Sequence, residues 1–231
     1  MSIRSITAAC ALAGFSFSPL CHASVWINEI HYDNVGSDTG EFVEVAGAAG
    51  TDLTGWSIVL YNGGSGAPYR TTSLNVTLTN GTTNGFGFAA IDVGSMQNGA
   101  PDGLALTDAA GGVIQFLSYE GQFAATSGPA AGLTSVDIGV AELTSTAIGY
   151  SLQLAGSGRR YEDFAWLTEP LEHTAGIANV QQTFSSLLPE DPGPDISAVP
   201  APGVLPLVLG ACAWFAFGDR RARPGTEAIA A

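Results

Sequence analysis

The sequence predicts an all-β domain with the architecture of an antiparallel sandwich. Three observations between residues 24 and 186 lead to this fold class. Short runs of β-branched and aromatic residues recur, clusters of Gly, Asn, Asp, Ser and Thr separate them, and no long stretch follows a helical period. Many short strands separated by turns are typical of a sandwich or a barrel.

Each apolar run is short enough to be a single strand and is bounded by turn residues. The expected strands are residues 25–31, 42–45, 56–61, 74–78, 86–91, 113–117, 151–154 and 164–167. Turns are expected where Gly follows Asn, Asp or another Gly, because these residues accept left-handed backbone angles. The candidates are Asn62-Gly63-Gly64, Asn80-Gly81, Pro101-Asp102-Gly103 and Gly111-Gly112.

The amino-terminal segment, residues 1–23, is predicted to be a secretory signal peptide. A lone basic residue, Arg4, precedes an apolar stretch at residues 6–17. Small residues stand at the two positions that a signal peptidase checks, Cys21 and Ala23, so cleavage is expected before Ser24.

The segment at residues 199–223 has three parts in order: a proline motif, an apolar run at 204–218 and a group of arginines. The motif residues are Val199, Pro200, Ala201, Pro202 and Gly203, and the arginines are Arg220, Arg221 and Arg223. With the motif included, the run approaches the roughly 20 residues that a membrane-spanning helix needs. Arginines favour the cytoplasmic side, so residues 224–231 are expected to be a cytoplasmic tail.

This three-part segment resembles the PEP-CTERM sorting signal of Gram-negative bacteria, in which Ala201 takes the place of the usual Glu. The resemblance implies an inner-membrane-anchored precursor and removal of the signal by an exosortase. The mature protein would then reach the cell surface or the extracellular matrix. The alternative is a plain carboxyl-terminal membrane anchor.

The positions of the cysteines and the net charge exclude some classes of function. The three cysteines, Cys10, Cys21 and Cys212, all lie in the two end segments, so no disulfide and no thiolate metal site is expected in the domain. The chain has 21 acidic residues against 7 basic ones, all of them arginine, and a net charge of −14. Such a surface repels phosphate backbones, so direct nucleic-acid binding is not expected.

Four short motifs resemble a bacterial lamin-tail domain. They are Asn28-Glu29-Ile30, Glu41-Phe42-Val43-Glu44, Asp52-Leu53-Thr54-Gly55-Trp56 and the closing stretch Ala175-Gly176-Ile177-Ala178-Asn179. The resemblance spans most of residues 24–186 and implies an immunoglobulin-like antiparallel β-sandwich. The Pro-rich, acidic residues 187–198 would then be an extended linker.

Three residue-level expectations follow from these motifs. Trp56, after a turn at Gly55, is expected to be a buried core anchor. Residues 41–45 alternate imperfectly between apolar and acidic side chains, as a half-buried strand does. Asp52 is expected to accept hydrogen bonds within its own turn.

One acidic constellation surrounds the polar turn at residues 33–40. Oxygen ligands on a flexible loop suit calcium, so the candidate cofactor is calcium. The candidate ligands are Glu29, Asp33, Asp38 and Glu41, with Asn34 and Glu44 nearby in the sequence. The spacing is not that of an EF-hand, and the alternative is a solvated hairpin loop.

Catalysis finds little support in the sequence. No G-x-S-x-G, HExxH or Walker motif occurs. Of the two histidines after residue 23, His31 is expected at a surface or sheet edge and His173 in the closing turn. We therefore expect a non-enzymatic structural or binding module of the cell surface. The alternatives are an accessory module for polysaccharide or extracellular DNA, and, more weakly, an unrecognised hydrolase.

Overall fold

The computed structural model describes residues 25–81 and 84–187. The expected signal peptide, the sorting segment, the cytoplasmic tail and all of the linker except Leu187 lie outside these residues. In the part of the chain that the structure describes, no helix is long and apolar enough to cross a membrane.

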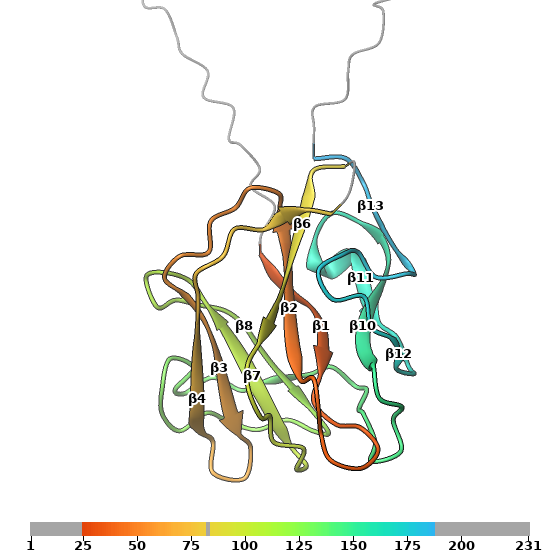
Figure 1. The fold of residues 1–231 in the computed structure, drawn as a ribbon. Coiled ribbons are helices and arrows are strands. Elements are labelled where there is room, and N and C mark those ends of the chain that lie inside the picture. Colours follow the sequence, from red (N-terminus) through yellow and green to blue (C-terminus); the bar gives the residue numbers. More distant parts are fainter. Residues whose placement is uncertain (1–24, 82–83, 188–231) are drawn as a thin grey trace, which may run out of the picture. The chain divides into compact units, whose positions relative to one another are not determined.

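The domain consists of two β-sheets, which confirms the all-β prediction (Figure 1). The first sheet contains, in order, β11 (Phe164–Trp166), β10 (Tyr150–Gly158), β1 (Trp26–His31), β2 (Phe42–Ala48), β6 (Phe86–Asp92) and β5 (Thr79–Asn80), with β12 (Leu171–Glu172) and β13 (Gln182–Phe184) also pairing with β10. The second contains β4 (Ala67–Leu74), β3 (Trp56–Asn62), β7 (Asp102–Thr107), β8 (Val113–Tyr119) and β9 (Val136–Asp137). A single 3-10 turn, η1 (Tyr161–Asp163), precedes β11. The pairings are antiparallel except β8 with β9 and β10 with β13.

A central core of aliphatic side chains joins the two sheets. The first sheet contributes alternate residues such as Ile27, Ile30, Val43 and Val45, and the second contributes Ile58, Leu60, Leu104 and Leu106. All of these side chains are buried. Burial of this apolar surface is the main force that holds a sandwich without disulfides together.

The outer face of each sheet is covered as well. An aromatic cluster covers the first sheet, and its members are Trp26, Ala46, Phe86, Phe88, Leu154, Phe164 and Phe184. A second cluster covers the other sheet, and its members are Val59, Tyr61, Ala105, Phe116, Phe123, Ala125 and Ala130. Strands β1 and β2 are therefore buried on both faces, and the expected half-buried strand at residues 41–45 is wrong.

A β-bulge in β1 fixes the position of the polar residues discussed below. Ile27 pairs with Val45, whereas Glu29 pairs with Glu44, so β1 advances two residues while β2 advances one. The extra residue is Asn28. A bulge of this kind lets Asn28 and Glu29 both point to the outer face of the sheet, where Glu44 also lies.

Most expected strands and turns are found within one or two residues of their predicted ends, but two expectations are wrong. Residues 74–78 do not form a strand, because Leu74 ends β4 and Thr77 makes only an isolated bridge with Asp52. Asp102 and Gly103 begin β7 rather than forming a turn. The Asp102 carboxylate accepts hydrogen bonds from the backbone N–H groups of Gly63 and Gly99, so it caps neighbouring loops.

Two tryptophans differ from expectation in their burial. Trp56 is only half-buried and packs against the central core from outside, so the prediction that it is a buried core anchor is wrong. The fully buried tryptophan is Trp26, with 1% of its surface exposed. The prediction for Asp52 is confirmed, because its Oδ1 accepts hydrogen bonds from the Thr54 N–H at 2.9 Å and the Thr54 hydroxyl at 2.7 Å.

Candidate functional site

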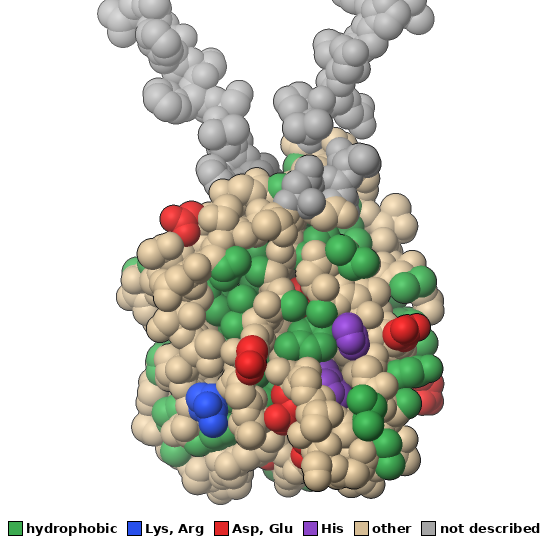
Figure 2. Space-filling model, in the orientation of Figure 1, with side chains coloured by type: hydrophobic (Ala, Val, Ile, Leu, Met, Phe, Trp, Pro, Cys, Tyr) green, Lys and Arg blue, Asp and Glu red, His purple; other side chains and the backbone are tan. Residues whose placement is uncertain are grey.

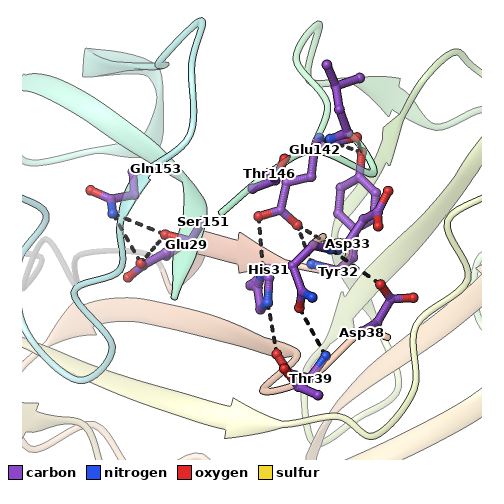
Figure 3. Close-up of polar contacts among 12 residues, drawn as sticks. Glu29, His31, Tyr32, Asp33, Asp38, Thr39, Glu142, Thr146, Ser151 and Gln153 are labelled. Atoms are coloured by element: carbon purple, nitrogen blue, oxygen red, sulfur yellow. Dashed lines mark hydrogen bonds and ion pairs between the residues drawn. The ribbon is translucent and has the colours of Figure 1, made fainter. Parts of the chain in front are cut away.

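The structure divides the four candidate calcium ligands between two places. Glu29 points toward Ser151 and Gln153, whereas Asp33 and Asp38 lie on the other side of His31 (Figure 3). Glu29 thus belongs to a buried network under the closing turn, which we define as residues 173–179. Asp33, Asp38 and Glu41 belong to the loop between β1 and β2.

The Glu29 carboxylate is fully buried and accepts four hydrogen bonds. The Ser151 hydroxyl donates at 2.5 Å and the Gln153 amide at 3.3 Å, both from β10. The backbone N–H of Thr174 donates at 2.9 Å and the Thr174 hydroxyl lies 3.1 Å from Oε2. Burial raises the pKa of Glu29, although these donors oppose that effect.

Glu44 lies directly opposite Glu29 in the β1–β2 register. It is also fully buried and accepts hydrogen bonds from the Asn28 amide at 3.0 Å and the Gly176 N–H at 2.6 Å. Burial, followed by the negative charge of Glu29, raises the pKa of Glu44 to about 8. At neutral pH the pair therefore holds one proton, which we place on Glu44 because it has fewer donors than Glu29.

The closing turn is tied to the sheet by its own side chains as well. The Asn179 amide donates to the backbone carbonyls of Asn28 at 3.1 Å and Leu154 at 2.8 Å. Inside the turn, the N–H of Ile177 donates to the carbonyl of Thr174 at 2.9 Å. The opening motif around Asn28 and the closing motif around Asn179, far apart in the sequence, thus meet in one buried network.

His31 is buried, so the prediction that it lies at a surface or edge is wrong. Its Nδ1 lies 2.9 Å from Oε1 of Glu142, and its Nε2 lies 3.1 Å from the carbonyl oxygen of Thr39. The other carboxylate oxygen of Glu142 accepts the N–H groups of Tyr32 at 2.5 Å and Asp33 at 2.8 Å. His31 and Glu142 thereby bind the end of β1 to the loop between β9 and β10 (Figure 3).

The partners of His31 define its protonation state. A carbonyl oxygen only accepts hydrogen bonds, so Nε2 carries a proton, and a proton on Nδ1 would be donated to the Glu142 carboxylate. Burial alone lowers the pKa of His31. The hydrogen bond and charge of Glu142, the Thr39 carbonyl and the charge of Glu41 outweigh it, so the pKa of His31 is raised.

We therefore expect His31 to be an imidazolium at pH 7. Nitrogen NMR shifts of the folded protein should show both ring nitrogens protonated. The exposed His173 provides the comparison within the same spectrum. In Glu142→Gln the His31 pKa should fall, because the negative charge that favours the imidazolium is lost. A neutral His31 in the unmodified protein at pH 7 would contradict this assignment.

Three of the four candidate calcium ligands, Asp33, Asp38 and Glu41, lie in the loop between β1 and β2. Asp38 lies beside Asp33 and Glu41, and it accepts a hydrogen bond of 3.4 Å from the Asn98 amide. Burial, followed by the charge of Asp38, raises the pKa of Asp33. Within residues 25–81 and 84–187, no three His, Cys, Asp or Glu side chains are arranged to hold a metal ion.

An open groove of about 470 Å³ borders this loop and the closing turn. Its polar lining comes mainly from Asp38, Glu41, Asp92 and His173, and Phe42 contributes an aromatic ring. The His173 and Phe42 rings meet edge to face with centroids 5.8 Å apart. Figure 2 shows acidic and histidine side chains gathered on one face of the domain, with a cationic side chain beside them.

The roles of Glu142 and Thr174 in these networks were not predicted from the sequence. Glu142 lies in a loop with no local pattern, and Thr174 is 145 positions away from Glu29 in the chain. One signal was available in the sequence. Asn28, Glu29 and Glu44 are polar residues inside otherwise apolar strands, and such residues are buried only when bonded to partners.

Comparison of the whole chain with protein-family models, curated proteins and solved structures gave no match. The lamin-tail and sorting-signal resemblances therefore remain expectations drawn from the motifs themselves.

Proposed function

We propose that the protein is an exported, surface-sorted structural or binding module without catalytic activity. Signal peptidase would remove the amino-terminal segment and leave a precursor anchored in the inner membrane. An exosortase would then remove the sorting signal, and the mature protein would reach the cell surface or the extracellular matrix. The sandwich between the two end segments would have the immunoglobulin-like topology that the lamin-tail motifs imply. The meeting of the opening and closing motifs in one buried network supports this fold assignment.

The observation that carries the non-enzymatic part of the proposal is the use of the buried ionisable groups. His31 and Glu142 resemble a catalytic dyad in spacing, but both are buried and all their polar atoms bind other parts of the chain. Glu29 and Glu44 hold the closing turn. Groups that fix loops in this way act on stability, whereas a general base must reach its substrate.

The sorting proposal predicts a shortened mature protein. Intact mass spectrometry of the protein extracted from the cell surface should show that everything beyond about Gly203 is gone. Replacing Arg220, Arg221 and Arg223 together by Gln should leave the precursor in the membrane fraction, since the basic residues set its orientation. A surface form that retains Cys212 and Arg223 would instead identify a plain membrane anchor.

The groove favours a second candidate function, binding of polysaccharide. Carboxylates such as Asp38, Glu41 and Asp92 can accept hydrogen bonds from sugar hydroxyls, and the acidic groups of the lining outnumber the nearby Arg70, which disfavours an anionic polymer. Calcium would enter here as a bridge between the carboxylates and the sugar. Extracellular DNA would need the same bridging cations, because the domain is acidic.

The calcium prediction is tested by thermal unfolding. Calcium at a hundredfold excess over its dissociation constant should stabilise the domain by about 2.7 kcal/mol. Magnesium at matched ionic strength should do less, because it demands a smaller and more rigid shell. Asp38→Asn should weaken the preference for calcium, whereas Asp137→Asn, outside the groove, should not. Equal shifts of the unfolding temperature with both ions would mean that these carboxylates belong to a solvated loop without a calcium site.

A further inference from the structure

Two fully buried carboxyl groups face each other across β1 and β2 without a cation between them. Glu29 and Glu44 are direct partners in the strand register beside the bulge, and they are close enough for the charge of Glu29 to act on Glu44. Among the described residues, the ion pairs are His31 with Glu142 and Arg160 with Glu162, and neither reaches this pair. The groups that donate hydrogen bonds to the two carboxyl groups are all neutral, so a second negative charge here is poorly compensated.

The closing turn is the cover that keeps water away from the pair. The Thr174 N–H donates to Glu29 and the Gly176 N–H donates to Glu44, so one short turn contacts both carboxyl groups. Ser151 and Gln153 of β10 contact Glu29 from the sheet, and Ala90 of β6 is the strand partner of Glu44. The turn is thus the wall of the site that is not part of a strand.

We propose that residues 173–179 form a pH-sensitive latch, which is closed when the Glu29–Glu44 pair shares one proton and released when both carboxyl groups are ionised. His173 is the titratable group that faces the pair from the turn itself, and its charge lies near Glu29. From β1 and β2 the titratable groups are Glu29, His31 and Glu44, and His31 is bound to Glu142 rather than to the pair. The contacting residues of β6 and β10 do not titrate.

Proton linkage gives the direction of this latch. Lifting the turn admits water to the pair, and a hydrated carboxyl group returns toward its ordinary pKa near 4.5 from the raised value of about 8 in Glu44. Opening therefore releases one proton between these two pH values. The equilibrium constant for opening should rise up to tenfold per pH unit from about pH 5 to about pH 8, and then level off.

The latch also forms part of the groove. His173 and Ala175 line it beside Asp38, Glu41 and Asp92, so release of the turn removes one of its walls. A change from mildly acidic to mildly alkaline surroundings would thereby alter the shape of the groove. This inference rests on the geometry of the pair and the turn, and it holds whether or not the groove binds polysaccharide.

Amide hydrogen exchange of the whole domain tests the latch. Protection of the Thr174, Gly176 and Ile177 amides, corrected for intrinsic exchange, should fall up to tenfold per pH unit between pH 5 and pH 8. Protection of core amides in β3, such as Ile58 and Leu60, should remain higher at every pH. Turn amides that exchange at the same rate as these core amides would show global unfolding and overturn the proposal.

Two substitutions isolate the carboxyl pair. Glu44→Gln keeps a neutral side chain of the same size at all pH values, so its turn amides should lose their pH dependence. Glu29→Gln removes the other charge, so the pH dependence of its turn amides should level off at a lower pH than in the wild type, because burial alone then raises the pKa of Glu44. Glu162→Gln, an exposed change of the same kind, should leave the profile unchanged. A wild-type slope in both Glu44→Gln and Glu29→Gln would overturn the proposal.

Discussion

Trp26→Ala is expected to lower the free energy of unfolding by about 3–5 kcal/mol, the usual cost of truncating a buried aromatic side chain. Trp26 contacts three rings of the outer cluster, with centroid distances of 6.0 Å to Phe86, 6.1 Å to Phe164 and 6.3 Å to Phe184. Its indole N–H also donates to Asn28 at 3.2 Å. The substitution would open a cavity and disturb the buried polar network at once.

Urea denaturation of Trp26→Ala beside Trp56→Ala checks this expectation. Trp56 is the matched control, because it is the same residue type at a half-buried position. Its loss should cost closer to the roughly 1 kcal/mol that is typical of point mutants. Equal costs at the two positions, or a larger cost at Trp56, would show that the outer aromatic cluster contributes less than its burial indicates.

The domain is expected to be more stable at pH 5 than at pH 8, by an amount on the order of 3–5 kcal/mol. Glu44 dominates this difference, because its folded-state pKa is about 8 and the ordinary value is 4.5. Between these values the folded chain keeps a proton that the unfolded chain releases. Unfolding is therefore favoured as the pH rises through this window.

The other shifted groups act mostly in the same direction. Burial raises the pKa of Glu29 as well, so its contribution has the same sign. His31 has a raised pKa because of Glu142 and Thr39 despite its burial, so its stabilisation is present below pH 6.5 and is lost as pH rises through the folded-state value. Asp52 and Asp163 are exposed carboxylates with lowered pKa values, and their opposite effect is confined to strongly acidic pH.

Urea midpoints measured at half-unit steps from pH 5 to pH 8.5 would test this profile. In Glu44→Gln the slope should become much shallower, whereas Glu162→Gln should keep the wild-type slope. A stability that is constant or rises with pH over this interval would mean that the two carboxyl groups are hydrated in solution.

The sequence was sufficient for the fold class and for most of the strands. Alternating turn residues and β-branched runs mark β1, β2, β3, β6 and β8, because each such strand must bury a side chain in the central core. Strand β4 was missed, since its sequence is polar and its position at a sheet edge needs little apolar surface. Strand β7 was missed as well, because Asp102 and Gly103 at its start are typical turn residues. Burial on both faces of β1 and β2 was also missed, because it depends on distant segments that cover the outer face.

The buried networks were beyond local sequence reasoning for a related reason. Glu142 meets His31 across 111 positions of the chain, and Thr174 meets Glu29 across 145. The bulge at Asn28 adds a further obstacle, because one extra residue changes which side chains share a face. Glu29 was therefore assigned to the acidic loop that follows it in sequence, although the fold places it under the closing turn.

The course of β2 and β6 has a practical consequence for attachment. Phe42 and Asp92 pair at the groove, and Ala48 and Phe86 pair at the other pole of the domain. At that second pole Val25 packs near Gly47, and the Leu187 N–H donates to the Asn84 carbonyl, so the described chain starts and finishes there (Figure 1). A tether, label or affinity tag joined at either of these two points is mounted on the pole farthest from the groove. The domain could then be immobilised on a sensor chip with the groove directed into solution.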